Sequence, residues 1–92
     1  MNKIEEHKKL CSDLHDLYIK KNTAYGDSFG DTFRKLGIIS AITRITDKYN
    51  RLVTLATNPK INPNDESITD TLIDLSNYCL MTILEIKNER SE

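Results

Sequence analysis

The chain has 92 residues, with 13 basic and 14 acidic side chains and a formal net charge of −1. This balance gives no broad basic field, which argues against direct binding of duplex DNA or RNA. No apolar run approaches the roughly 20 residues of a membrane span, and residues 1–9 lack the features of a secretory signal, so we expect a cytoplasmic protein. Because a domain this small buries only about two-thirds of its unfolded surface, we also expect a helical homo-oligomer.

The N-terminal third is predicted to hold one long helix and one short one. Apolar residues at intervals of three, four and seven predict a helix over residues 3–21. Two glycines, a serine and several Asn and Asp residues favour a loop over residues 22–30. Asp31 is a candidate cap for a short helix over residues 32–36, which Gly37 would close.

Two further helices are predicted in the rest of the chain. The first covers residues 38–57 and is ended by Asn58-Pro59, and the second begins after Asp65 and covers residues 66–89. No segment shows strand alternation, so we predict one all-α domain over residues 1–92, a compact bundle of three long helices plus a short one. The expected apolar stripes are Ile38, Ile42, Ile45, Tyr49, Leu52 and Ala56, and Ile68, Leu72, Leu75, Cys79, Ile83 and Ile86.

The two cysteines fall within apolar stripes of predicted helices. Cys11 and Cys79 are far apart in the sequence and have no companions, so neither a disulfide framework nor a zinc site is indicated. We therefore predict two buried, reduced thiols that pack as small apolar side chains.

Charged residues gather on one face of the helix predicted over residues 38–57. Arg44, Asp47, Lys48 and Arg51 lie within about 100° of one another on the helical wheel, opposite the apolar stripe. One interpretation is a solvated surface of ion pairs at three- and four-residue spacing. The other is a charged surface that faces a ligand.

The last helix carries acidic residues among apolar ones. Asp70, Asp74 and Asn77 share one side of it, and Glu66 lies one turn earlier. Apolar residues surround much of this helix, which predicts burial on every side and hence partly desolvated carboxylates that need a positive partner. The first turn of a helix favours an acid in any case, so Glu66 is the weaker candidate.

Two kinds of positive partner fit these acids. Lys48, Arg44 or Arg51 of the neighbouring helix can form an internal ion network with Asp70 and Asp74. Alternatively, Asp70 and Asp74, with Asp47, can bind Mg²⁺, which accepts one or two carboxylates and completes its shell with water and substrate phosphate. In that case Arg44, Lys48 and Arg51 are free to bind phosphate oxygens.

The segment between the first two helices supplies aromatic side chains. Tyr25 and Phe29, with Lys20 and Lys21, are candidates for stacking on a base and contacting a phosphate. The alternative is that these aromatic rings only cover the end of the bundle.

Three strings carry a resemblance to a known family: Lys-Asn-Thr-Ala-Tyr-Gly-Asp-Ser-Phe at 21–29, Arg-Ile-Thr-Asp-Lys-Tyr-Asn-Arg-Leu at 44–52, and Glu-Ser-Ile-Thr-Asp-Thr-Leu-Ile-Asp-Leu-Ser-Asn-Tyr at 66–78. Over residues 21–86 the chain resembles the nucleotide modification associated domain 1 family. That family is common in phages and prophages and is linked by prediction to nucleotide metabolism or DNA base modification. The resemblance implies a nucleotide ligand.

More distantly, the pattern is similar to the all-α nucleoside triphosphate pyrophosphohydrolases of the MazG and dimeric dUTPase type. Those enzymes hold magnesium with a Glu-x-x-Glu on one helix and a Glu-x-x-Asp on a later one. Here the first pair reads Arg44-x-x-Asp47, and Thr71 stands three positions before Asp74, with Asp70 one position further back. With one ligand position taken by a cation and another shifted, the pattern favours nucleotide binding over hydrolysis.

These patterns together predict a magnesium-dependent nucleoside triphosphate pyrophosphohydrolase-like protein. Its catalytic acids would be Glu66, Asp70 and Asp74, and its metal ligands Asp47, Asp70 and Asp74. The alternatives are a non-catalytic protein that binds or sequesters a nucleotide or a nucleotide signal, and a structural adaptor with an internal ion network. The predicted nucleotide- and phosphate-binding residues are Lys21, Tyr25, Arg44, Lys48, Arg51 and Asn77.

Overall fold

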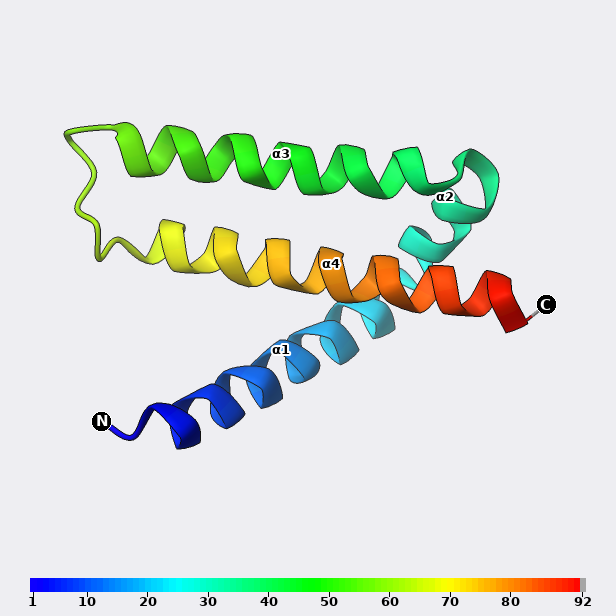
Figure 1. Cartoon of the computed structure of the whole chain (residues 1–92), viewed down its shortest axis with the longest axis horizontal. Coiled ribbons are helices and arrows are strands. Elements are labelled where there is room, and N and C mark those ends of the chain that lie inside the picture. The colour runs from blue at the N-terminus through cyan, green and yellow to red at the C-terminus, as the bar shows by residue number, and fades with distance from the viewer. Residues whose placement is uncertain (92) are drawn as a thin grey trace.

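The computed structural model describes residues 1–91, and its four elements are all helices (Figure 1). They are α1 (Lys3–Tyr25), α2 (Ser28–Leu36), α3 (Ile38–Thr57) and α4 (Glu66–Ser91). The predicted all-α bundle of three long helices and a short one is confirmed. Within the described residues, no helix combines the length and the apolar character that crossing a membrane requires.

Helices α3 and α4 form an antiparallel hairpin, which is the most extensive helix–helix contact of the chain (Figure 1). Helix α2 closes one end of this hairpin and packs on both of its helices. Helix α1 crosses the hairpin obliquely and packs on α4 near the middle of that helix, so its N-terminal half extends away from the rest of the chain.

The junction between α1 and α2 is much shorter than predicted. Residues 22–30 were expected to form a loop, but α1 continues to Tyr25 and α2 begins at Ser28. Gly26 ends α1 with φ 68°, a conformation that glycine adopts at little cost, and its N–H donates to Asn22 O at 2.7 Å. Helical hydrogen bonding therefore overrides the turn propensity of Asn22 and Thr23.

The bounds of α3 and the start of α4 agree with the sequence signals. Gly37 has φ 77° and separates α2 from α3, as its predicted role requires. Asn58 ends α3 before Pro59, as predicted. Asp65 caps α4 by accepting the Ser67 N–H at 2.8 Å, and the Ser67 hydroxyl donates to the same carboxylate. The hydroxyl hydrogen bond, followed by the backbone one, lowers the pKa of the Asp65 carboxyl.

The interior of the chain is small and partly polar. Phe33 of α2, which is 1% exposed, and Ala41 of α3 are its buried apolar residues. Three residues of α4 are also buried, namely Thr71, Asn77 and Thr82. The two threonine hydroxyls donate to carbonyls one turn earlier in α4, so their burial leaves no unpaired donor.

The predicted apolar stripes face the interior only in part. On α3 the side toward α4 runs through Ala41, Ile45 and Leu52, while Ile42 and Tyr49 remain exposed. On α4 the side toward α3 carries the buried threonines, whereas four leucine and isoleucine residues are 44–51% exposed, so the expectation of burial on every side is wrong for this chain. These four residues are Leu72, Leu80, Ile83 and Leu84.

The predicted burial of the two cysteines is also wrong. Cys11 and Cys79 are free thiols, as predicted, but both are exposed rather than buried. Cys79 belongs to the apolar stripe of α4 that faces away from the interior, and Cys11 lies on the projecting part of α1.

Candidate functional site

A cavity of about 260 Å³ lies between the C-terminal part of α1, the start of α2 and the facing sides of α3 and α4. One wall is aromatic, because the rings of Phe29 and Tyr78 stack with their centroids 5.8 Å apart. Tyr18 and Tyr25 of α1 line the same space. Flat apolar surfaces of this kind suit a planar aromatic ligand.

The charged wall is centred on Asp74 of α4. One of its carboxylate oxygens accepts from Lys48 Nζ of α3 at 3.1 Å, and the other from Lys21 Nζ of α1 at 3.3 Å. The Asp74 side chain is only 26% exposed, so the two lysines compensate a partly desolvated charge. This carboxylate therefore ties three helices together, as predicted for Lys48 but not for Lys21.

Two further groups present unused hydrogen-bonding capacity to the cavity. Arg44 of α3 lines it, and within residues 1–91 the Arg44 guanidinium makes no ion pair or side-chain hydrogen bond. Asn77 of α4 donates from Nδ2 to Leu14 O at 3.2 Å, which fixes the orientation of its amide and leaves the oxygen as an acceptor. The cavity thus offers one free cation and one oriented carbonyl oxygen among the described residues.

A second charged cluster lies at the edge of the cavity and holds Asp27, which lines it. Arg34 of α2 pairs with Asp27 at 3.3 Å, with Asp31, and with Glu85 of α4 at 3.6 Å. Burial, and then the charge of Asp27, raise the pKa of the Glu85 carboxyl. A Cβ at Gly30 would come within 2.7 Å of both the Asp27 and Glu85 carboxylates, so a larger residue there would displace these two side chains.

The structure brings together five of the predicted site residues on the cavity wall and leaves the others outside it. Lys48 contacts the site through Asp74, and the Arg51 side chain donates from Nε to Thr71 Oγ1 at 3.3 Å. The three remaining acids, Glu66, Asp47 and Asp70, are exposed and do not line the cavity. The five residues on the wall are Lys21, Tyr25, Arg44, Asp74 and Asn77.

The metal-binding prediction stays a prediction. Across residues 1–91, no three His, Cys, Asp or Glu side chains lie close enough together to hold a metal ion. Asp70 precedes Asp74 by one helical turn, so these two acids share a side of α4. Such a pair meets the minimum for Mg²⁺, which commonly uses one or two carboxylates and takes its remaining ligands from water and phosphate.

Sequence reasoning missed part of the aromatic wall. Tyr78 and Tyr18 were not singled out, although Tyr78 follows Asn77 and lies one turn after Asp74 on α4. That spacing was the available signal, because residues three and four apart on a helix share a face. Tyr18 became a wall residue only through the way α1 crosses α4, which the sequence does not specify.

Comparison with known families identifies the chain. The profile of nucleotide modification associated domain 1 matches residues 21–86. The chain belongs to this family. Every residue that lines the cavity lies within the matched segment except Tyr18. The family segment therefore contains nearly the whole candidate site.

No curated protein and no solved structure matches the chain. The name of nucleotide modification associated domain 1 connects the family with nucleotides and names no reaction. The similarity to MazG-type pyrophosphohydrolases rests on the sequence strings alone.

Proposed function

We propose that this member of nucleotide modification associated domain 1 binds a nucleotide in the cavity between its helices. The observation that carries the proposal is the meeting of an aromatic wall with basic side chains from different helices. The Phe29–Tyr78 stack lies on the same cavity as Lys21 and Arg44. A nucleotide offers a planar base and anionic phosphates, which are the two features that these walls complement.

The arrangement of the two walls suggests how the ligand would lie. The base would contact the tyrosines and phenylalanine, and the Asn77 oxygen would accept a hydrogen bond from a base N–H or a sugar hydroxyl. The phosphates would lie toward Arg44, because its guanidinium is unpaired within residues 1–91 and can form a bidentate contact. Lys21 and Lys48 would also bind the phosphates if their ion pairs with Asp74 broke.

In addition to nucleotide binding, we propose Mg²⁺-dependent hydrolysis of the bound nucleotide. Asp74 and Asp70 would hold the ion from α4, with the predicted Asp47 and Glu66 as further acids. When bound, the ion would neutralise phosphate charge and assist attack of water at phosphorus. The protein's own side chains would bind the phosphates and orient them, whereas Glu66, the predicted proton acceptor, does not line the cavity.

The alternative function is nucleotide binding without turnover, and two observations favour it. Both carboxylate oxygens of Asp74 are already held by lysines, and the described residues contain no group of three metal-binding side chains. Such a protein would sequester a nucleotide or a nucleotide signal. It needs the same cavity but no positioned water.

The origin, location and oligomeric state of the protein are also part of the proposal. The family resemblance implies a phage or prophage protein of nucleotide metabolism or modification, which would act in the cytoplasm as a homo-oligomer. The residues of this chain that line the cavity run from Tyr18 to Met81.

The test is a panel of nucleoside mono-, di- and triphosphates, each with and without Mg²⁺, read by thermal shift, isothermal calorimetry and phosphate analysis. Release of pyrophosphate supports the hydrolase, and stabilisation without products supports the binder. The Arg44→Met variant should lose the response, whereas Arg90→Met removes an exposed arginine of α4 outside the cavity and should keep it. The proposal fails if no nucleotide binds, or if both variants behave alike.

A further inference from the structure

One side of the α3–α4 hairpin is apolar and uncovered, and we call it the outer face. Arg44 of α3 and Asn77 of α4 both line the cavity, so that side of each helix is the cavity side. At about 100° per residue, Ile42 and Tyr49 lie on the opposite side of α3, and Ile83 lies on the opposite side of α4. The outer face consists of Ile38, Ile42, Tyr49 and Val53 of α3 and Leu72, Cys79 and Ile83 of α4, all of them exposed.

The single chain exposes more surface than a folded monomer of its mass is expected to expose. The chain exposes 7214 Å², whereas a folded monomer of its 10.6 kDa is expected to expose about 5,500 Å². The projecting half of α1, whose residues are exposed, contributes part of this excess of about 1,700 Å², and the total is roughly twice the 800 Å² that each partner buries in a standard stable interface. The Cα radius of gyration, 15.0 Å, likewise exceeds the roughly 12 Å expected for a domain of this length.

The lack of charge on the outer face indicates which kind of surface would cover it. The charged residues of α3 all lie on the cavity side or toward α4, and the seven residues of the outer face carry no charge. An uncharged, two-helix face with apolar residues at intervals of three and four is complementary to another face of the same kind. A second copy of the hairpin, related by a two-fold axis, supplies that face.

We infer that the outer face binds the outer face of a second copy of this chain, so that two α3–α4 hairpins form a four-helix bundle with the two cavities on its outside. Helix α4 is then covered on a further side, while Leu80 and Leu84 stay outside this interface. This interface would form whether or not the cavity binds a nucleotide.

The two cysteines provide a direct readout in the native protein. Cys79 belongs to the outer face and is covered in the dimer, whereas Cys11 on α1 stays accessible. Light scattering should give about 21 kDa, twice the 10.6 kDa chain mass. In the Cys11→Ser protein, a thiol reagent should label Cys79 at least about tenfold more slowly than in urea, because a covered group reacts only on opening.

Substitutions at two neighbouring, equally exposed residues of α4 test which side of the helix forms the interface. Ile83 and Leu84 are 50% and 51% exposed, but only Ile83 belongs to the outer face. Ile83→Glu should yield single chains or unfolded protein and release the Cys79 thiol, while Leu84→Glu should leave mass and labelling unchanged. A wild-type mass of one chain, or an oligomer whose Cys79 reacts as fast as in urea, would overturn the inference. Equal effects of the two substitutions would also overturn it.

Discussion

In most small domains apolar side chains are enclosed and polar ones are exposed, but the two sides of the α3–α4 hairpin show the opposite distribution. The cavity side is partly enclosed by α1 and α2, yet it carries Asp74, Asn77 and the basic residues. The outer face is open, yet it carries isoleucine, leucine and tyrosine side chains. Polar groups are placed inside a chain where a ligand or an ion pair compensates them, and apolar groups outside where another surface covers them.

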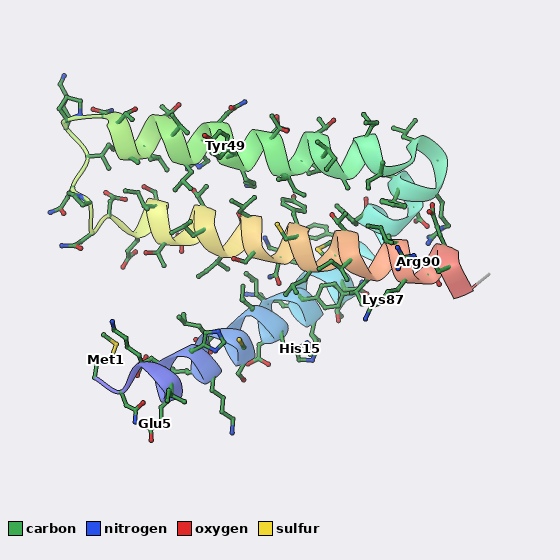
Figure 2. The ribbon with its side chains drawn as sticks, in the orientation of Figure 1. Met1, Glu5, His15, Tyr49, Lys87 and Arg90 are labelled. Atoms are coloured by element: carbon green, nitrogen blue, oxygen red, sulfur yellow. The ribbon has the colours of Figure 1, made fainter. Side chains whose placement is uncertain are left out.

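Figure 2 labels Tyr49 on α3 and His15 on α1, and α4 runs between these two helices. Tyr49 is 57% exposed although it belongs to the predicted apolar stripe of α3. The position of α1 explains the contrast, because α1 covers the cavity side of α4 and leaves the other side free.

The largest effect is expected from a charge on the outer face. Ile42→Asp should lower the free energy of unfolding by about 3 kcal/mol, because an unpaired carboxylate would be buried between two chains. Thr43→Asp changes the adjacent exposed residue outside this face and should cost about 0.5 kcal/mol or less. Urea unfolding at one fixed protein concentration measures both, and similar losses would contradict the distinction between the two sides.

A smaller effect is expected on the cavity side, where the change concerns binding rather than folding. Arg44→Met removes a charge-assisted contact to phosphate worth about 1.5–3 kcal/mol, so nucleotide affinity should fall about ten- to a hundredfold. Isothermal calorimetry measures the affinity, and thermal unfolding should stay unchanged because Arg44 has no partner within residues 1–91. A loss of stability without a loss of affinity would assign Arg44 a structural role.

Asp74→Asn distinguishes the ion network from a metal site. It weakens two partly exposed ion pairs, each worth about 0.2–1 kcal/mol, so the fold should persist with a modest loss of stability. Any dependence of nucleotide binding on Mg²⁺ should disappear, because the central carboxylate is gone. Calorimetric titrations with and without Mg²⁺ provide the comparison. Global unfolding, with no magnesium effect in the wild type, would favour the purely structural network.

The smallest effect concerns pH. Burial raises the pKa of the Glu85 carboxyl in the folded chain, so the folded state holds this proton more tightly than the unfolded state. Its contribution to stability is therefore complete below the unfolded pKa and is lost as pH rises through the raised folded value. The wild type should lose stability over that interval relative to Glu85→Gln, as seen in urea unfolding from pH 4 upward. Parallel pH profiles would show that Glu85 does not titrate differently on folding.

Local features of the fold were predictable because local sequence determines them. The breaks at Gly37 and Asn58-Pro59 gave the bounds of α3, and Asp65 gave the start of α4. The junction after α1 was mispredicted because Asn22 and Thr23, which favour turns, lie in a helix that Gly26 ends. Turn propensity is a weaker influence than continued helical hydrogen bonding.

The site was only half predictable, since it depends on how helices pack. Periodicity put Asp74 and Asn77 on one side of α4 and Lys48 on one side of α3, and these sides do meet. The pairing of Lys21 with Asp74 depends on where α1 crosses, which no local pattern specifies. The predicted apolar stripe of α3 was only partly assigned to the right side, because Ile45 and Leu52 lie toward α4 whereas Ile42 and Tyr49 are exposed. Periodicity identifies an apolar side without showing what covers it.

The central claim is that the cavity side binds a nucleotide between its aromatic and basic walls. The most direct measurement is calorimetric titration of the wild type and Arg44→Met with nucleoside mono- and triphosphates, with Arg90→Met as the control. We predict saturable binding to the wild type and to Arg90→Met, and an affinity at least about tenfold weaker for Arg44→Met. Absence of binding by the folded wild type, or equal affinity in all three proteins, would contradict the claim.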